Sequence, residues 1–220
     1  MEIKLKIEFQ KNRKKRSENL ERPFRFLPDL PDLTTHWTGK TVPEICIIHT
    51  TAGHQKQSAH DFFSDFIDRR LCTDFIDVKG EVYSQREMNK WGSHVGKAKW
   101  NGVKLTSKSC LGVELACAGK LELRNGKWFT WFNKEIPEDQ VRYVTKEQGY
   151  NSEGGFQKLT EAQEYGLMKY IHVLQFFGVK QFLFHSDVSG YRGKTDVDGS
   201  LSLPLRKFME RMELRPLDIH

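Results

Sequence analysis

Two histidines that lie far apart in the sequence, His49 and His185, are among the residues best suited to metal binding and catalysis. His185 opens a segment that closes with Lys194 and Asp196. Two imidazoles and one carboxylate can form the three-ligand set of a catalytic zinc ion, which leaves the fourth position open for water. Lys194 and Asp196 are two positions apart, so in an extended segment both side chains project to one side. A cation beside a zinc-bound water is suited to the hydrolysis of an amide.

The elements around both histidines are predicted to be buried strands. The apolar, β-branched run Glu44–His49 ends at the first histidine, and the run Val179–Phe184 delivers the second. Strands are rigid enough to hold a metal ligand within a fraction of an ångström. A single histidine after a strand is usually an ordinary structural residue. Two of them, with Lys-Thr-Asp after the second, indicate a site.

The alternation of strands and helices is irregular, which predicts an α/β fold with a mixed central β-sheet flanked by helices. The chemistry of turns and helix starts places the remaining elements. These are a helix over about 59–70 capped by Ser58, a hairpin at Lys79-Gly80, a central strand over Leu111–Cys117, a hairpin at Asn125-Gly126, a helix from the capping box at Thr160 to Gly178, and a last helix over about 203–212. Residues 133–158 are predicted to be an irregular polar excursion.

The domain organisation is predicted to be an N-terminal extension over residues 1–42 and one domain over 43–220, with an excursion at about 120–158. The extension combines a short strand over Glu2–Phe9, a Pro-rich loop over Pro23–Pro31 and a basic run. That run consists of Lys11, Arg13, Lys14, Lys15 and Arg16. It is a solvated loop in the plainer interpretation, and a surface for an anionic cell-wall polymer in the other.

The composition is that of a globular chain with a net charge of +6, which favours anionic partners. Nucleic acid is disfavoured, because no nucleic-acid-binding motif is present and the histidines would stay unexplained. No apolar run approaches the roughly 20 residues of a membrane span, and the N-terminus lacks the apolar core of a secretory signal. We therefore expect synthesis in the cytoplasm. The 4 cysteines include no C-x-x-C pair, which predicts free, mostly buried thiols and disfavours a cysteine zinc site.

Four stretches in order resemble the zinc-dependent N-acetylmuramoyl-L-alanine amidases of the second type. That family includes phage lysozyme-amidases, bacterial anhydro-muropeptide amidases and animal peptidoglycan recognition proteins. The stretches are Ile47–Gly53 at the first ligand, Trp91–Gly96 at a loose form of the W-H-A-G segment, Ser109–Leu115 at the S-I-G-I-E-L strand, and His185–Asp196 at the closing H-S-D to K-T-D motif. The resemblance covers about residues 43–213 and implies the family's mixed sheet with a zinc groove on one face.

The reaction implied by the resemblance is hydrolysis of the amide between N-acetylmuramic acid and L-alanine in peptidoglycan. His49, His185 and Asp196 would bind Zn²⁺, which makes hydroxide available near neutral pH and polarises the carbonyl. Family members carry either aspartate or cysteine as the third ligand, and this sequence has aspartate.

The resemblance implies catalytic roles for two further residues, Glu114 and Lys194, and a binding role for His94. Glu114, an acid costly to bury in a central strand without a role, would be the general base and then the acid for the leaving amine. Lys194 would stabilise the oxyanion. The plainer interpretations are that Glu114 is a solvent-facing residue of the sheet and that Lys194 is a lysine in a surface loop. His94 would bind substrate or steady the leaving group, or it would only line the groove. Many family members carry a tyrosine at the start of the first hairpin strand, where this sequence has Cys72 if aligned by Gly80 and Thr73 if aligned by Phe75.

Two functions from different classes follow from these residues. The first is a zinc hydrolase of the cell wall, either a lytic (antimicrobial) enzyme such as a phage endolysin or a recycling amidase, with peptidoglycan or muropeptide as substrate. The second is a non-catalytic recognition module that holds muropeptide. The presence of both Lys194 and Asp196 favours the enzyme, because recognition modules typically lose the third zinc ligand.

Overall fold

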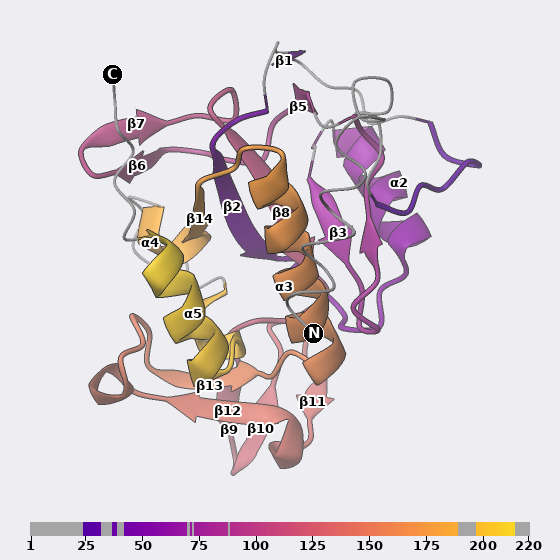
Figure 1. Ribbon diagram of the computed structural model, residues 1–220. Helices are drawn as coiled ribbons and strands as arrows, with labels where there is room; N and C mark the ends of the chain where they lie inside the picture. The colour runs from indigo at the N-terminus through magenta and orange to yellow at the C-terminus, as the bar shows by residue number, and fades with distance from the viewer. Residues whose placement is uncertain are drawn as a thin grey trace, which may run out of the picture.

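The computed structural model describes residues 24–31, 37–38, 42–69, 71, 73–87, 89–188 and 197–213. Several predictions concern residues outside these ranges, namely the strand over Glu2–Phe9, the basic run, Cys72, Lys194 and Asp196. The described part has a mixed central sheet with helices packed against it, as Figure 1 shows, so the predicted fold class is confirmed.

The central sheet has five strands in the order β14-β2-β8-β3-β4. Its strands are β14 (Gln181–Phe184), β2 (Ile45–Thr50), β8 (Cys110–Leu115), β3 (Asp74–Ile76) and β4 (Val82–Tyr83). The first four run parallel, and β4 returns antiparallel to β3 through the predicted hairpin. Because β14, β2 and β8 are parallel, their carboxyl ends meet at one edge of the sheet, where His185, His49 and Glu114 lie.

Four α-helices are described: α2 (Ala59–Arg69), α3 (Glu161–Phe176), α4 (His185–Val188) and α5 (Leu203–Glu213). Smaller paired strands are β1 (Trp37–Thr38) with β5 (Lys90–Trp91), β6 (Ala98–Trp100) with β7 (Val103–Leu105), β9 (Glu122–Arg124) with β10 (Lys127–Phe129) and β11 (Glu135–Ile136), and β12 (Val141–Val144) with β13 (Gly154–Gln157). Short 3₁₀ turns are η2 (Glu138–Gln140), η3 (Lys146–Gln148) and η4 (Asp198–Ser200). No helix among the described residues is long and apolar enough to cross a membrane.

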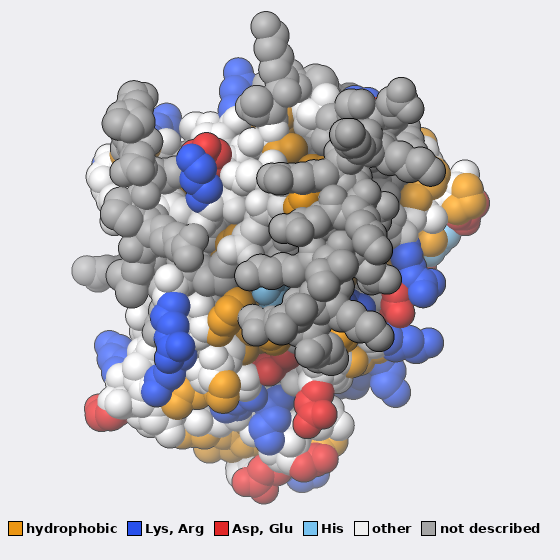
Figure 2. All heavy atoms as spheres, in the orientation of Figure 1, with side chains coloured by type: hydrophobic (Ala, Val, Ile, Leu, Met, Phe, Trp, Pro, Cys, Tyr) orange, Lys and Arg blue, Asp and Glu red, His pale blue; other side chains and the backbone are white. Residues whose placement is uncertain are grey.

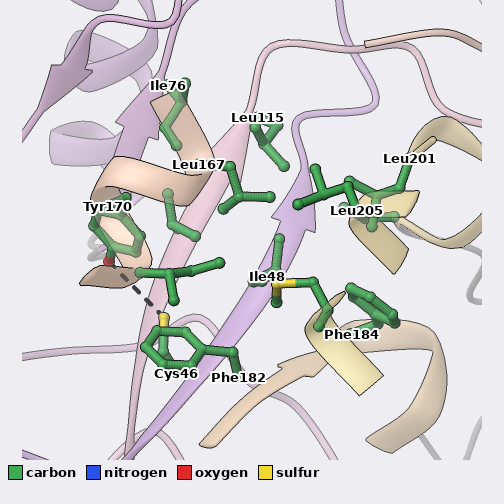
Figure 3. Close-up of a cluster of buried hydrophobic side chains, with 14 of the residues drawn as sticks. Cys46, Ile48, Ile76, Leu115, Leu167, Tyr170, Phe182, Phe184, Leu201 and Leu205 are labelled. Carbon is green, nitrogen blue, oxygen red and sulfur yellow. Dashed lines mark hydrogen bonds between the residues drawn. The ribbon is translucent and has the colours of Figure 1, made fainter. Parts of the chain in front are cut away.

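The two faces of the central sheet bury different sets of side chains, because successive strand residues point to opposite faces. Cys46 and Ile48 of β2 pack with Phe182 and Phe184 of β14 against α3 and α5, in the core drawn in Figure 3. The opposite set, which includes Ile45 and Ile47 of β2, packs with Ala98 and Leu105 of β6 and β7. His49 continues this second set, so it faces away from α3 and α5.

The predicted helix starts are confirmed by their caps. Ser58 accepts a hydrogen bond from the backbone N–H of Asp61 at the start of α2, and Thr160 forms a capping box with Gln163 at the start of α3. Each cap satisfies backbone donors that the first turn of a helix leaves without a partner. The end of α3 follows the prediction too, since Gly178 adopts a left-handed φ of 99°.

Helix α3 and the β3–β4 hairpin approach each other through two glycines. A Cβ atom at Gly166 would lie 2.4 Å from the carbonyl oxygen of Gly80, and one at Gly80 would lie 2.0 Å from that of Ala162. Both obstacles are backbone atoms, which cannot rotate away. Glycine at these positions therefore lets α3 lie directly on the hairpin turn.

Gly166→Ala tests this close approach. Alanine raises helix propensity by up to about 1 kcal/mol, whereas overpacking a filled interior costs about 1–3 kcal/mol. We expect the clash to win and the free energy of unfolding, measured by urea denaturation, to fall by about 1–2 kcal/mol. Lys169→Ala, on the exposed side of the same helix, should change it by less than about 0.5 kcal/mol. A Gly166→Ala protein as stable as the wild type would show that the hairpin yields.

The prediction that residues 133–158 are irregular is wrong. They contain β11 and the antiparallel pair β12–β13, and Phe156 of β13 is fully buried. A Cβ atom at Gly155 would lie 2.3 Å from the Trp128 ring, so the indole packs on this glycine. The sequence around Gly154-Gly155 predicts a loop, because glycine weakens a strand. The residue that requires glycine here is Trp128, which lies 27 positions earlier in the chain (155 − 128 = 27). In Figure 1, β9 to β13 lie at the end of the molecule toward which β2 points.

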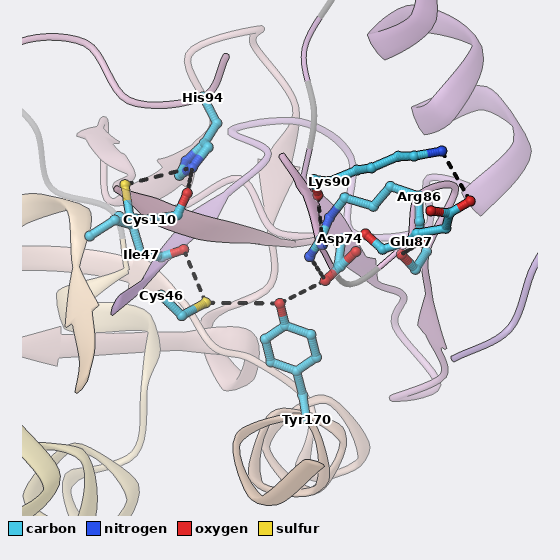
Figure 4. A network of polar contacts seen from close by, with 10 residues as sticks. Cys46, Ile47, Asp74, Arg86, Glu87, Lys90, His94, Cys110 and Tyr170 are labelled. Atoms are coloured by element: carbon cyan, nitrogen blue, oxygen red, sulfur yellow. Dashed lines mark hydrogen bonds and ion pairs between the residues drawn. The ribbon is translucent and has the colours of Figure 1, made fainter. Parts of the chain in front are cut away.

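A buried polar network joins the sheet to the segment that precedes His94. Asp74 accepts from Arg86 Nη2 at 2.5 Å and from the Tyr170 hydroxyl at 2.8 Å, and Arg86 also donates to the carbonyl of Lys90 (Figure 4). Asp74 and Arg86 are 0% and 1% exposed, and a charge at such depth requires a partner. The network fixes the backbone at Lys90, four residues before His94. No local sequence pattern predicts this contact.

The described cysteines agree with the prediction of free, buried thiols. Cys46, Cys110 and Cys117 are buried and free. Burial raises the pKa of the Cys110 thiol to about 12, and it also raises the pKa values of the other two. These thiols are therefore protonated at neutral pH and act as small apolar residues.

Candidate metal centre

Three imidazoles converge at the carboxyl edge of the parallel strands, on the face away from α3 and α5. The Nδ1 atoms of His49 and His185 are 3.1 Å apart, although the residues are 136 positions apart in the sequence. The other ring nitrogen of His49, Nε2, lies 3.2 Å from Nδ1 of His94. His49 is thus the central ring, and its two nitrogens face two different partners.

The strand register explains the first of these contacts. Ile48 of β2 pairs with Phe184 of β14, so the next residues, His49 and His185, are neighbours at the ends of adjacent parallel strands. His185 starts the single-turn helix α4, and its side chain is 8% exposed while that of His49 is 3% exposed. Both predicted ligand positions are therefore held by rigid, buried backbone.

The facing Nδ1 atoms fit a shared metal ion. Two nitrogens that bind zinc at about 2.0–2.1 Å with a tetrahedral angle between them are roughly 3.3 Å apart. The observed 3.1 Å between the two Nδ1 atoms is close to that spacing. A neutral imidazole offers one lone pair for coordination, and here two such positions point at one another. The donor set and its geometry are those that zinc requires from two of its protein ligands.

The third predicted ligand, Asp196, lies outside the described residues, as does Lys194. Within the described part of the chain, no three His, Cys, Asp or Glu side chains are grouped to hold a metal ion. His94 is close to His49, but it faces Nε2, the nitrogen on the other side of the ring from the Nδ1 pair. One ion between His49 and His185 would thus not be bound by His94.

Glu114 lies beside this pair on the neighbouring strand. His49 of β2 and Glu114 of β8 are direct partners in the parallel ladder, which places their Cα atoms about 4.8 Å apart across the strands. Residues Cys110, Gly112 and Glu114 share one face of β8, and this is the face of His94. The Glu114 side chain is half-buried. The carboxylate therefore lies on the same face as the imidazoles, and its Oε2 atom is buried.

His94 lies in the loop between β5 and β6 and is held by Ser107 and Cys110. Its ring Nε2 donates to the backbone carbonyl of Cys110 at 3.1 Å (Figure 4). Its backbone N–H donates to the Ser107 hydroxyl at 3.1 Å. Desolvation by the surrounding protein lowers the pKa of His94 to about 4. The ring is therefore neutral at pH 7. Nothing local in the sequence indicated that Ser107 and Cys110 would hold this residue.

Of the two residues that could replace the family's tyrosine, Cys72 lies outside the described residues and Thr73 is described. It is fully buried, and its methyl group lies 2.8 Å from where a Cβ atom of Gly112 would stand, beside the His94 ring. No phenol is near the three imidazoles at this position. Among the described residues, Glu114 is a carboxylate that pairs with His49 in the strand ladder.

The side chains that follow His185 in α4 make polar contacts of their own. Asp187 accepts hydrogen bonds from Asn151 and from the Ser186 hydroxyl. Burial raises the pKa of the Asp187 carboxyl.

An aromatic group stands at the rim, beside the loop that follows His49. Trp131 is 71% exposed, and its indole N–H donates to the carbonyl of Ala52, three residues after His49. Phe132 lies edge-on to Trp131 and also contacts the His54 ring, with centroids 4.5 Å apart. The excursion therefore adds a fixed, solvent-facing indole to the edge of the sheet that carries the site.

The surface drawn in Figure 2 carries charges of both signs, with basic side chains gathered over α5. Lys207 and Arg211 line an open hollow there with Leu203, Pro204 and Phe208. The predicted run Lys11–Arg16 lies outside the described residues. Positive charge is thus also present on the described surface.

Comparison with known proteins shows a likeness in structure alone. No protein-family model and no curated protein matches the sequence. Among solved structures, a selenomethionine derivative of AmpD matches with a TM-score of 0.50 at 14% identity, over 84% of this chain and 93% of that chain. The amidase AmiD from E. coli, in complex with anhydro-N-acetylmuramic acid-L-Ala-D-γ-Glu-L-Lys, has a TM-score of 0.49 at 15% identity, over 78% of this chain and 60% of that chain. Drosophila PGRP-LB has a TM-score of 0.45 at 14% identity, over 76% and 85%.

The match to AmpD establishes that the chain shares its fold, which confirms the predicted architecture.

Proposed function

We propose that this chain is a zinc-dependent hydrolase of the amide between N-acetylmuramic acid and L-alanine in peptidoglycan. The observation that carries the proposal is the pair of Nδ1 atoms of His49 and His185, 3.1 Å apart and beside Glu114. Two ring nitrogens at this separation match the spacing of two nitrogen ligands on one zinc ion. The order of the four motifs and the shared fold add to it.

In this proposal His49 and His185 hold the zinc ion together with Asp196. When bound, zinc supplies a Lewis acid and lowers the pKa of a coordinated water to about 7. Glu114 accepts the proton of the attacking water and passes it to the nitrogen of the leaving L-alanine. Lys194, two residues before Asp196 in the sequence, would stabilise the negative charge that develops on the carbonyl oxygen.

The partner is peptidoglycan or a soluble muropeptide. The role that fits is cell-wall lysis, as by a phage endolysin, or muropeptide recycling. The net charge of +6 favours contact with an anionic wall polymer, for which the run Lys11–Arg16 is the proposed surface.

The test is mass spectrometry of purified peptidoglycan and of a soluble muropeptide after incubation with the zinc-loaded protein. We expect release of stem peptides that carry a free L-alanine amine, loss of this release with a chelator, and its return with added zinc. A protein that binds zinc and muropeptide but cuts neither substrate would be a recognition module. Cleavage at a different bond would overturn the proposed specificity.

A further inference from the structure

His94 and His49 continue a chain of hydrogen bonds that starts at the carbonyl of Cys110, and its direction can be worked out from that end. A backbone carbonyl only accepts, so His94 Nε2 must carry the hydrogen that it donates to Cys110. A neutral imidazole has one N–H, which leaves Nδ1 of His94 as an acceptor. His49 Nε2, 3.2 Å away, must then be the donor in that contact.

The direction of this hydrogen bond determines whether the other ring nitrogen of His49, Nδ1, carries a hydrogen. With its hydrogen on Nε2, neutral His49 carries a lone pair on Nδ1, the atom that faces His185 at 3.1 Å. A histidine that binds a metal commonly donates its second nitrogen to a carboxylate or a carbonyl, which sets the tautomer and the ring orientation. Here the acceptor is a second imidazole, and the carbonyl of Cys110 sets its tautomer in turn.

The position of the His94 ring is itself built into the fold. The backbone N–H groups of His94 and Val95 both donate to the Ser107 hydroxyl, at 3.1 and 3.0 Å. The ring lies against the backbone of β8 at Gly112, where a Cβ atom would stand 2.6 Å from Nδ1 of His94. The two rings meet edge to face, with an interplanar angle of 88°. A ring held in this way presents its acceptor nitrogen to His49 at a fixed place.

We propose that His94 is a positioning residue for the metal site: through a carbonyl–His94–His49 relay it holds His49 in the tautomer and orientation that present Nδ1 to zinc. The inference rests on the proposed function for the identity of the metal. It differs from a substrate-binding role for His94, in which the ring would contact muropeptide and leave the affinity for zinc unchanged.

Two variants of His94 separate these roles. His94→Asn keeps an oxygen acceptor close to the place of Nδ1, whereas His94→Gln reaches toward the place of Nε2 and leaves His49 without that acceptor. We expect His94→Gln and His94→Ala to weaken zinc affinity by about 10–100-fold, the range for loss of a residue that orients a ligand, and His94→Asn to stay within about threefold of the wild type.

The measurement is the Kd for zinc of the full chain, from competition with a chromophoric chelator, with thermal melting of the metal-free proteins as the check on folding. The expected ranking is wild type and His94→Asn together, then His94→Gln and His94→Ala. Equal affinity in all four proteins would overturn the relay, as would equal weakening by all three substitutions in folded proteins.

The relay and the proposed function fail in different ways. If the wild type binds zinc with the expected ranking of variants but does not cut peptidoglycan, the hydrolase is excluded and the relay stands. If peptidoglycan is cut and the ranking is absent, the relay is overturned and the hydrolase stands. A raised KM for muropeptide in His94→Ala, with unchanged zinc affinity, would assign the ring to substrate. A wild type that binds no zinc would overturn both.

Discussion

Asp196→Ala is expected to abolish zinc binding and hydrolysis together. His49 and His185 supply two ring nitrogens at 3.1 Å, and a catalytic zinc site takes three protein ligands. Loss of a direct ligand should weaken zinc affinity by more than about 100-fold, the upper end of the range for residues that only support a ligand. Zinc content by atomic absorption after dialysis and turnover of a soluble muropeptide measure the two losses.

Two further variants, Asp196→Cys and Asp187→Asn, make this test specific. Asp196→Cys should retain zinc, because thiolate is an equally good third ligand and the resemblance includes members with cysteine there. Asp187→Asn, which changes a nearby carboxylate that contacts Asn151 and Ser186, should bind zinc like the wild type. Stoichiometric zinc in Asp196→Ala would remove this residue from the ligand set and require a different third ligand.

Glu114→Gln is expected to leave zinc bound and to lower kcat by about 10²–10⁴-fold, the contribution of a positioned general base. Glutamine has nearly the same shape as glutamate but cannot accept the proton of the attacking water. Because Glu114 pairs with His49 across the two strands, we expect the loss of kcat to arise at the metal site and not from a change in the fold. The pH dependence of kcat/KM should lose its acidic limb, because that limb reports the ionisation of the base.

Matched variants show whether the effect belongs to this carboxylate. Glu122→Gln, on exposed β9, should turn over at the wild-type rate. Glu114→Asp keeps the charge on a shorter side chain and should fall between the wild type and Glu114→Gln. If Glu114→Gln loses less than about tenfold and keeps the acidic limb, the base is another group.

The local parts of the fold were predictable because short-range physics decides them. Asn125 and Gly126 adopt φ values of 50° and 76°, which a two-residue hairpin turn requires and which these two residue types tolerate. Thr160 and Gln163 satisfy each other's backbone donors within one turn of α3. The runs that end at His49 and before His185 are strands because apolar, β-branched residues fit a buried sheet. In each case the deciding contacts lie within a few residues.

The sequence by itself thus determined the α/β class, the helices and strands that carry the chemistry, and the residues that resemble a zinc site. Asp196 and Lys194 remain predictions of the sequence, since they lie outside the described residues. The tertiary structure alone decided how the imidazoles meet. The register of β2 against β14 brings Nδ1 of His49 to Nδ1 of His185, and Gly112 admits the His94 ring against β8.

The same distinction explains the error over residues 133–158. Gly155 reads as a loop residue until the Trp128 ring is seen to pack on it. The ion pair of Asp74 and Arg86 likewise depends on burial that neither residue type indicates. These contacts join residues far apart in the chain, and their energies depend on strand register and on close packing of whole elements. Local propensity contains no information about either, so only the folded arrangement decides them.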